Sequence, residues 1–489
     1  MWWVVFPPPR VARKHTRAVW RVSPGHPPAR AARRPPPAHH RADMQPELQA
    51  VILASCSDGE NLYPLTEQMP SVLLPVANRH LLSFQLELLE RAAGFKQVLV
   101  VTEERWLTRL STYVSETYKG RLQIEVTVVP EGAGSADALR TLAPKLHTDF
   151  VLIAGDVITD MDFARLADMH RLQGAAVTAL LKEAPPREAG IPKKAKDLDG
   201  ADFIGVDERR QRLLHVESAA DCDAGVSSIS QSLLQSYPHL QIHTDLADMH
   251  VYIFAHWTLQ VLELKPHFVS VKFELLPYLV RKQFLSKANL KIPTAAGVQA
   301  QALALSTSAA AQQTSRGADG FRCSCLVMPH DAGYCVRANT LPSYAQANLD
   351  VAKGGVTHCE KEAELDKAAD AILAKEGNFA LKSFSADSAR GFGVEVGARS
   401  SVKKSSVGPH CRLGANVKLT NCILMDHVVV HDKVTMSNCI VCSNAEVGEG
   451  ASLKDAQVGV GVSIDPGAVV KGEAIDNGGD NDAGDDEDE

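Results

Sequence analysis

The chain lacks the features that would place it at once in a membrane or secreted class. No apolar run approaches the ~20 residues that a membrane-spanning helix needs. Its ten cysteines follow no framework of paired spacings. We identify no secretory signal, so the sequence predicts reduced thiols in a cytosolic protein. The pairs Cys323/Cys325 and Cys439/Cys442 have the spacing of half a zinc site. Neither has a second pair nearby, and we interpret all four as small buried side chains.

Charge is distributed unevenly along the chain. Residues 1–43 contain eight Arg, one Lys, one acid and nine Pro, giving a charge of +8. Because the whole chain carries −7, residues 44–489 carry −15. We predict that residues 1–43 are a disordered basic extension, with a transit peptide or a true start at Met44 as alternatives. Residues 473–489 contain nine acids and no base, which predicts a disordered acidic tail.

The region 44–350 alternates between short apolar strands and helices. A helix is expected where Leu82, Leu86 and Leu89 form one apolar stripe that ends before Gly94. The expected strands are residues 51–54, 97–102, 124–129, 150–154 and 251–254, and the other expected helices are residues 106–118, 136–142 and 273–284. Units of this kind predict a parallel, Rossmann-like sheet. Ligands of such sheets bind at the carboxyl ends of the strands.

Later segments interrupt or follow this pattern. Residues 286–320 are rich in Ala, Gln, Ser and Thr, which predicts a flexible insertion within the first domain. Residues 335–348 (CVRANTLPSYAQAN) resemble a segment of sugar-nucleotidyltransferase families in which a short strand leads to a helix that ends Tyr-x-x-Ala-Asn. We expect residues 351–392 to be a linker that contains an amphipathic helix at residues 360–375.

Residues 393–472 contain a repeat in which aliphatic residues recur every six positions. Gly, Asn, Asp and Ser fill the turns between them. The phased positions are Val396 and Val402; Val407, Leu413 and Leu419; Val428, Val434 and Ile440; Val447 and Leu453; and Ile464 and Val470. This period predicts a parallel β-helix in which the aliphatic column faces inward. We expect His410, His427 and His431 to lie at solvent-facing corners.

The opening strand leads into a loop that is poor in glycine and in cations. Residues 50–76 read AVILASCSDGENLYPLTEQMPSVLLPV. This skeleton resembles the signature of enzymes that join a nucleotide to a sugar phosphate. In those enzymes the loop is glycine-rich and ends in arginine, and a later segment reads Pro-Lys-Pro. Here the loop keeps one glycine and adds Asp58 and Glu60, and the later segment is Pro70-Ser71-Val72.

These replacements remove groups that nucleotidyl transfer needs. Catalysis of phosphoryl and nucleotidyl transfer depends on positioning, Mg²⁺ and cationic side chains. Each missing group costs on the order of 10²–10³ in rate. We therefore predict a degenerate enzyme with no catalytic residue, no cofactor-binding residue and no cofactor.

Asp156 is the one candidate for a remnant of the metal site. Gly155-Asp156-Val157 follows the strand at residues 150–154 and resembles the Gly-Asp motif whose aspartate holds Mg²⁺. We treat Asp156 as a vestigial Mg²⁺ candidate only. The alternative is that it caps a strand-to-helix turn.

The whole pattern predicts an α/β Rossmann-like domain followed by a parallel β-helix. This combination resembles ADP-glucose and GDP-mannose pyrophosphorylases and two subunits of eukaryotic translation initiation factor 2B. The resemblance implies an α/β Rossmann-like nucleotidyltransferase domain followed by a left-handed parallel β-helix of roughly three hexads per coil. Residues 277–284 (PYLVRKQF), residues 202–207 (DFIGVD) and residues 421–425 (NCILM) resemble the gamma-subunit family of that factor. The likeness covers nearly all of residues 44–472.

The resemblance implies a non-catalytic subunit of the guanine-nucleotide exchange factor for initiation factor 2. Its implied partners are the epsilon subunit, with which it forms the catalytic subcomplex, and the alpha, beta and delta subunits. The GTPase initiation factor 2 is the implied substrate, in the cytosol, with no direct contact to nucleic acid or membrane. The alternative is a sugar-nucleotide pyrophosphorylase of GDP-mannose type, or its regulatory subunit.

Overall fold

The computed structural model describes residues 48–55, 62–92, 94–184, 202–207, 209, 211–218, 229, 231–284, 321–356 and 383–476. Several predicted features lie outside these residues. They are the basic extension (1–43), most of the glycine-poor loop (56–61), the insertion (286–320), the linker helix (360–375) and the tail from residue 477.

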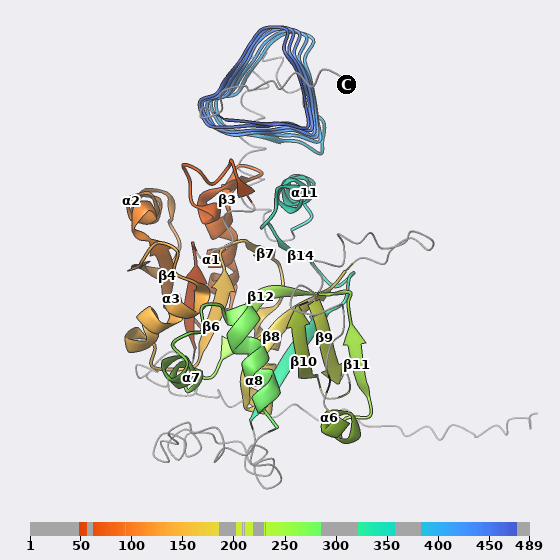
Figure 1. Ribbon diagram of the computed structural model, residues 1–489. Helices are drawn as coiled ribbons and strands as arrows, with labels where there is room; N and C mark the ends of the chain where they lie inside the picture. Colours follow the sequence, from red (N-terminus) through yellow and green to blue (C-terminus); the bar gives the residue numbers. More distant parts are fainter. Residues whose placement is uncertain are drawn as a thin grey trace, which may run out of the picture. The chain divides into compact units, whose positions relative to one another are not determined.

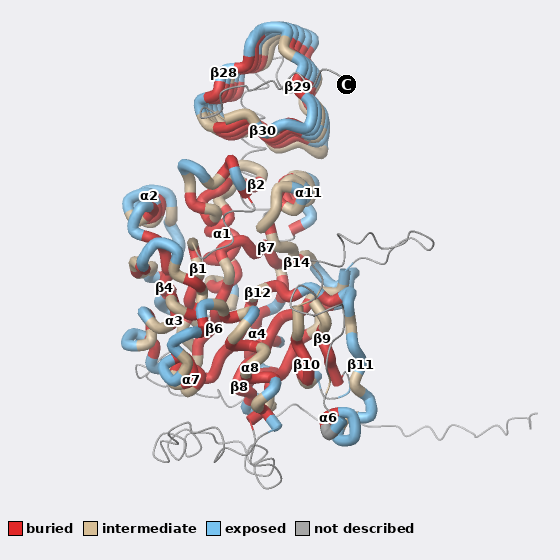
Figure 2. The backbone as a smooth tube through the Cα atoms, viewed as in Figure 1, coloured by how far each residue is buried: buried red, intermediate tan, exposed pale blue. Residues whose placement is uncertain are grey.

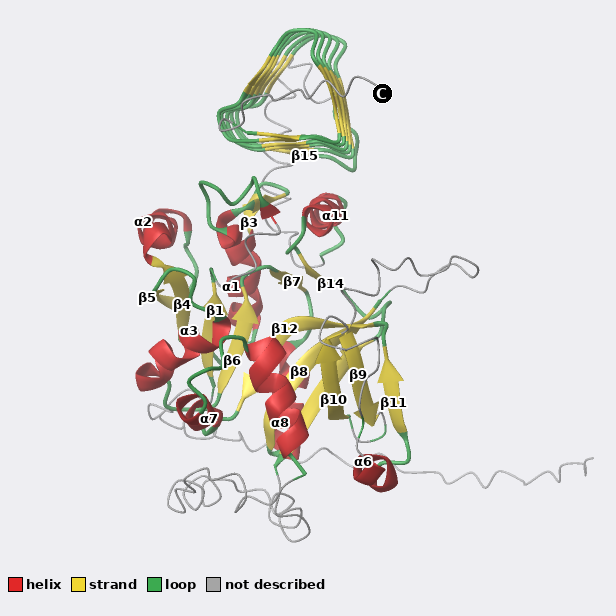
Figure 3. Ribbon diagram, viewed as in Figure 1, coloured by secondary structure: helices red, strands yellow, loops and turns green. Residues whose placement is uncertain are grey.

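Ten strands of the N-terminal region form one mixed sheet (Figures 1 and 3). In chain order they are β1 (Gln49–Leu53), β4 (Gln97–Glu103), β5 (Gln123–Val129), β6 (Phe150–Ala154), β8 (Ala175–Glu183), β9 (Asp202–Asp207), β10 (Arg212–Ser218), β11 (Leu240–His243), β12 (Leu246–Phe254) and β13 (Arg322–Met328). Their order in the sheet is β11-β9-β10-β13-β8-β12-β6-β1-β4-β5.

The first half of this sheet confirms the prediction of a parallel, Rossmann-like unit. Strands β6, β1, β4 and β5 pair in parallel. The run Val98–Val101 of β4 is buried on both sides, as expected for a strand covered by helices on both faces. The connecting helices include α1 (Leu81–Arg91), α2 (Leu107–Thr112) and α3 (Ser135–Leu142).

The second half of the sheet is mixed, so the parallel arrangement of the first four predicted strands does not extend to it. Strand β12 pairs antiparallel with both β6 and β8, and Leu246 at its start lies opposite Glu183 at the end of β8. Strands β9, β10 and β11 of the same sheet lie between β8 and β12 in the sequence, and β12 then starts beside the end of β8 and runs the other way. The sequence between residues 184 and 245 gave no sign of this return.

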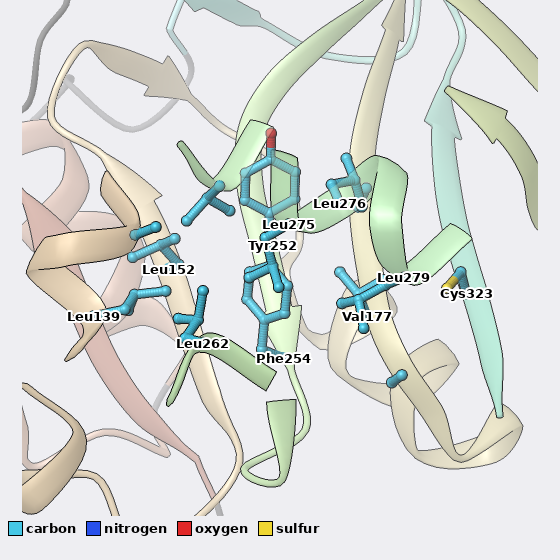
Figure 4. Close-up of a cluster of buried hydrophobic side chains, with 14 of the residues drawn as sticks. Leu139, Leu152, Val177, Tyr252, Phe254, Leu262, Leu275, Leu276, Leu279 and Cys323 are labelled. Carbon is cyan, nitrogen blue, oxygen red and sulfur yellow. The ribbon is translucent and has the colours of Figure 1, made fainter. Parts of the chain in front are cut away.

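Helices cover both faces of the sheet, and two apolar clusters fill the layers between them (Figure 2). On one face, Tyr252 and Phe254 of β12 pack with α3, α7 (Thr258–Leu264) and α8 (Leu276–Lys282), as Figure 4 shows. On the other face, the alternating residues Val251 and Ile253 pack with α1, α2 and α4 (Phe163–Gln173). This alternation along one strand is the period of two that defines a strand buried on both sides.

Shorter elements complete the first domain. A two-stranded ribbon pairs β7 (Val157–Thr159) with β14 (Cys335–Arg337), and another pairs β2 (Pro75–Val76) with β3 (Arg79–His80). Helix α11 (Leu341–Ala352) follows β14, which confirms the predicted strand-then-helix segment. Its start is fixed by a capping box, in which the Thr340 hydroxyl accepts a hydrogen bond from the Ser343 N–H.

The C-terminal region is a parallel β-helix with three sheets, which we call the first, second and third β-helix sheets (Figure 1). The first contains β15 (Ala389–Arg390), β18 (Ser406–Val407), β21 (Ile423–Leu424), β24 (Ile440–Val441), β27 (Gln457–Val458) and β30 (Ala474–Ile475). The second contains β16 (Glu395–Val396), β19 (Arg412–Leu413), β22 (Val429–Val430), β25 (Glu446–Val447) and β28 (Ser463–Ile464). The third contains β17 (Ser401–Lys403), β20 (Lys418–Thr420), β23 (Thr435–Ser437), β26 (Ser452–Lys454) and β29 (Val469–Lys471).

Each coil of this β-helix contains 17 residues instead of the 18 that three hexads would give. Paired positions in neighbouring coils, such as Ser400 and Val417, are 17 residues apart. The shortened step lies between the third and first sheets, where inward residues such as Val402 and Val407 are five positions apart. The predicted histidine corners are exposed, and His410 and His427 both have positive φ.

The shortened step corrects one predicted inward residue. Val428 and Val434 are fully buried in the interior of the β-helix, as expected. Ile440 instead points outward with Ile423, Met425 and Cys442, in a cluster that contains residues of the first domain such as Tyr344. A strict six-residue count places Ile440 on the wrong side because it ignores the five-residue step.

Candidate functional site

A cavity of about 690 Å³ opens at the carboxyl ends of β1, β4 and β6. This is the edge where ligands of such sheets bind. Leu53, Glu103 and Ala154, at the ends of these strands, contribute to its wall, and Glu67, Glu131 and Lys272 extend it. Both apolar and polar side chains line the wall.

The charged groups of this cavity are unfavourable for a phosphate. Its acidic lining residues are Glu67, Glu103, Glu131 and Asp156. The lining cations are already paired. Arg105 contacts Glu103 at 2.6 Å, and Lys272 contacts Asp202 at 2.9 Å. Among the lining residues that the structure describes, no Lys or Arg is left without an acidic partner.

Asp156 lies in the turn between β6 and β7, so it caps no helix. Its Oδ2 accepts hydrogen bonds from Arg337 Nε at 3.0 Å and Arg337 Nη2 at 2.5 Å. Both side chains are buried, with 9% and 11% of their surface exposed. Oδ1 is also buried and has no hydrogen-bond partner among the described residues. The guanidinium therefore pairs with one oxygen of this carboxylate and places a positive charge beside it.

The glycine before Asp156 is required by close packing. A Cβ on Gly155 would lie 2.1 Å from Val72 Cγ1 and 2.6 Å from the Leu53 carbonyl oxygen. Only glycine fits this approach between β6 and β1. The Gly-Asp pair thus keeps its backbone role even though the carboxylate is bound to arginine.

Ser71 stands where the resemblance expects the lysine of Pro-Lys-Pro. It begins the short helix η2 (Ser71–Leu73) and lines the cavity. Its hydroxyl donates a long hydrogen bond of 3.4 Å to the Ala54 carbonyl. Ser71 therefore brings no positive charge to the position where the resemblance expects a lysine.

His250 is a further polar residue of the cavity that the sequence did not single out. Burial lowers the pKa of its imidazole well below the usual range, and nearby Arg337 and Lys272 lower it further. Its Nε2 is buried without a hydrogen-bond partner in the described part of the chain. Close by, the Tyr252 hydroxyl donates to Asp248 Oδ2 at 2.5 Å. Burial raises the pKa of Asp248.

The cysteine pairs do not form metal sites within the described ranges. Cys323 and Cys325 are buried on the same face of β13, and burial raises the pKa of Cys325 to about 12. Cys439 faces the interior of the β-helix, whereas Cys442 faces outward. No group of three or more His, Cys, Asp or Glu in these ranges could hold a metal ion.

Comparison with protein families agrees with both halves of the fold. Residues 49–193 match the family described as nucleotidyl transferase. Residues 382–470 match the family described as EIF2B subunit epsilon LbH domain, a left-handed β-helix.

The similar proteins include eIF2B gamma subunits and a nucleotide-sugar enzyme. The chain is 30% identical over 396 residues to translation initiation factor eIF2B subunit gamma of Dictyostelium discoideum, covering 76% of this chain and 89% of the relative. It is 29% identical over 325 residues to the protein of that name in Schizosaccharomyces pombe, covering 63% and 66%. A UTP–glucose-1-phosphate uridylyltransferase of Synechocystis is 29% identical over 150 residues, covering only 28% of this chain and 38% of that enzyme.

The fold and the cavity define a nucleotidyltransferase-like protein with a hexapeptide-repeat β-helix. Likeness to a nucleotide-sugar enzyme is confined to part of the first domain, whereas likeness to the gamma subunits covers most of the chain. The chain belongs to the family of translation initiation factor eIF2B gamma subunits. The resemblance found in the sequence is thereby confirmed.

Proposed function

We propose that this chain is a non-catalytic subunit of the guanine-nucleotide exchange factor for initiation factor 2. In this role it pairs with the epsilon subunit to form the catalytic subcomplex that promotes GDP/GTP exchange. The observation that supports a non-catalytic role most directly is the buried Asp156–Arg337 pair. One oxygen of this carboxylate is held by a guanidinium whose positive charge would repel Mg²⁺, and we regard Asp156 as a remnant.

The charge of the cavity supports the same proposal. Nucleotidyl transfer needs cations or metal ions where negative charge develops around phosphorus. The cavity instead offers several carboxylates, and its Arg105 and Lys272 are paired. The degenerate loop adds Asp58 and Glu60 to the sequence between β1 and η2. We propose no catalytic, cofactor-binding or metal-binding residue in this chain.

The proposed partners follow from the family. They are the epsilon, alpha, beta and delta subunits of the same factor, with the GTPase initiation factor 2 as substrate. The β-helix gives a large surface for assembly, since solenoid folds commonly act through extended surfaces. We propose a cytosolic location with no direct contact to nucleic acid or membrane. Within the described residues, no helix is long and apolar enough to cross a membrane.

The proposed domain limits are those of the sequence pattern. They are residues 44–350 for the nucleotidyltransferase-like domain, 351–392 for a linker and 393–472 for the β-helix, with residues 1–43 and 473–489 as extensions. The paired strands β15 (Ala389–Arg390) and β30 (Ala474–Ile475) lie just outside the predicted β-helix limits, so the β-helix extends slightly beyond them at both ends.

Affinity purification from a native extract, followed by mass spectrometry, tests the proposal. The expected result is recovery of the other four subunits, including a larger partner with its own nucleotidyltransferase-like and β-helix regions. A parallel assay measures Mg²⁺-dependent synthesis of nucleotide-sugars by the isolated chain. Recovery without those subunits, together with nucleotide-sugar synthesis, would contradict the proposal.

A second candidate function is a pyrophosphorylase of GDP-mannose type, or a regulatory subunit that binds a nucleotide-sugar without turnover. The retained cavity of about 690 Å³ is the observation that favours it. Calorimetry with nucleoside triphosphates and nucleotide-sugars, with and without Mg²⁺, separates the candidates. The exchange-factor proposal predicts weak or undetectable triphosphate binding, whereas micromolar, Mg²⁺-dependent binding would favour the enzyme.

A further inference from the structure

The three outer faces of the β-helix differ in their chemistry. The outer side chains of the first sheet include Ile423, Met425 and Ile440, which are buried in the cluster shared with the first domain. The outer face of the second sheet carries charges of both signs. Arg412 contacts Glu395 at 3.3 Å, and His431 contacts Glu446 at 2.7 Å. These two faces therefore have their outer groups covered or paired.

The outer face of the third sheet carries only cationic, hydroxyl and aliphatic side chains, and we call it the lysine face. Its residues are Ser401, Lys403, Lys418, Thr420, Thr435, Ser437, Ser452, Lys454, Val469 and Lys471. Four of the ten are lysines and none is acidic. In a chain whose region 44–489 carries −15, this is a local reversal of charge.

The lysines of this face have no acidic partner within the described coils. All four are exposed, and none takes part in an ion pair. By contrast, Lys433 at a neighbouring corner is paired, because its Nζ lies 2.7 Å from Glu449 Oε1. Lys454 and Lys471 lie directly opposite each other in register, where like charges destabilise a sheet. An anion beside them would remove this repulsion.

The chain itself contains a segment of complementary charge that follows the last coil in the sequence. The described part ends at Asp476, immediately after the last coil. Residues 477–489 then contain seven acids and no base. We propose that this acidic segment docks on the lysine face of the same chain. An external acidic partner must displace it to bind there.

The lengths are compatible with this arrangement. Thirteen residues can span up to about 43–47 Å when extended. One side of a coil is at most about 20 Å long, because a hexad extends by ~3.3 Å per residue. The five strands of the third sheet, about 4.8 Å apart, cover roughly another 19 Å. The segment can therefore leave the end of β30, cross one side and follow the lysine face to its first strand.

The cavity of the first domain is a poorer site for the same segment. Tyr63 lines that cavity, and its hydroxyl contacts the Asp476 carboxylate. The cavity wall nevertheless holds four carboxylates, and its Lys and Arg are already paired. A run of seven acids would be repelled there and attracted to the four lysines.

Zero-length cross-linking with a carbodiimide tests the proposal on the full chain, because it joins only lysine amines and carboxylates that touch. Trypsin leaves residues 472–489 as one peptide, so the partners of the tail can be identified by mass spectrometry. We expect cross-links from residues 480–489 to Lys403 and Lys418, the lysines farthest along the chain from the tail. They should be lost in ~1 M salt, where the Debye length is about 3 Å.

Matched charge reversals give the control. In Lys418→Glu/Lys454→Glu, tail cross-links to Lys403 should fall by roughly tenfold, since two attractive contacts become repulsive. The double variant Lys96→Glu/Lys119→Glu changes the charge equally at exposed sites of the first domain and should leave them unchanged. An equal effect of both double variants would overturn the proposal. So would tail cross-links confined to Lys14 of the basic extension or to Lys96 and Lys119.

Two further measurements distinguish the tail of the same chain from other possible occupants of the lysine face. In a mixture of ¹⁵N-labelled and unlabelled chains, the cross-links should join segments of one label, whereas mixed-label links would show docking on a second copy. A chain that stops after Asp476 should elute from heparin at higher salt than the full chain. The gain should disappear in Lys418→Glu/Lys454→Glu. Unchanged elution after tail removal would contradict the proposal.

Discussion

Arg337 contacts the buried carboxylate of Asp156 across 181 positions of the sequence. The two residues meet because β14 pairs with β7, which places Arg337 opposite Val157, the residue that follows Asp156. A ribbon of only three residues per strand thus brings a permanent cation beside this carboxylate.

Removing this guanidinium should destabilise the first domain strongly. In Arg337→Gln the Asp156 carboxylate stays buried without a charged partner, which costs about 3–5 kcal/mol. The free energy of unfolding from urea titration measures this loss. The double variant Asp156→Asn/Arg337→Gln should recover most of it, because no buried charge remains.

An exposed pair provides the comparison for that experiment. Arg281 is 65% exposed and lies 3.8 Å from Glu217. Arg281→Gln should change the stability by no more than about 1 kcal/mol. If both single variants cost the same, the buried pair would have no special role in stability.

Restoring two lost cations should not restore an enzyme. Ser71→Lys combined with Asn61→Arg returns the side chains that the nucleotidyltransferase signature expects. The loop still holds a single glycine, and Arg337 still occupies Asp156, so substrate and metal remain badly placed. We expect no nucleotide-sugar synthesis above background in a coupled pyrophosphate assay. Measurable turnover would show that the fold had kept its catalytic geometry.

A charged side chain inside the β-helix should unfold the neighbouring coils as well as the coil that contains it. Val434 is fully buried, and each coil contacts only the next, so Val434→Asp leaves an unpaired carboxylate in the shared interior. Thr435→Asp, one position along and exposed on the lysine face, should leave the domain folded. Limited proteolysis should yield a resistant fragment of the first domain from the former variant only. Equal resistance of both would mean that the inward register is wrong.

Ile440 should behave differently from Val434 although both are apolar and buried. Because Ile440 packs outward in the cluster that contains Tyr344, Ile440→Asp should leave the coils intact. Hydrogen exchange in α11 should then increase, while protection of β23 and β26 stays unchanged. Loss of protection throughout the β-helix would place Ile440 inside it.

The pH dependence of the free energy of unfolding should reflect the protonation of His250. Its pKa in the folded protein lies well below 6.5, so the unfolded chain binds a proton that the folded chain does not. The stabilisation is complete above about pH 6.5 and is lost as the pH falls toward the folded-state pKa. One such group contributes up to ~1.4 kcal/mol per pH unit to the slope.

Replacing His250 should reduce this slope. His250→Asn removes the titration and suits the positive φ of 51° at this position, which Asn adopts readily. Urea unfolding between pH 7 and pH 5 should show a shallower loss of stability in the variant. An identical slope in both proteins would mean that His250 does not remain neutral in the folded state.

Local patterns in the sequence were sufficient for much of the fold. The apolar run at residues 150–154 became β6 with the same limits, and the stripe of Leu82, Leu86 and Leu89 became α1. Both depend on a few neighbouring residues. The antiparallel direction of β12 depends instead on the path of the chain between β8 and β12, which includes β9, β10 and β11. No local sequence pattern predicts this path.

The site was predicted less completely for the same reason. Asp156 was singled out because Gly155-Asp156 is a short motif in one turn. Arg337, Lys272 and His250 were not, because they come from three elements that are distant in the sequence. Likewise, counting by six placed Val434 correctly. It then ignored the five-residue step that follows and so placed Ile440 on the wrong side.

The 17-residue coil also limits the lengths by which this domain can vary. An insertion or deletion of one whole coil returns every later strand to its own sheet and keeps inward side chains inside. Any other length would rotate the following strands onto a different face and expose their apolar residues. Natural versions of this β-helix are therefore expected to gain or lose sequence in steps of a complete coil.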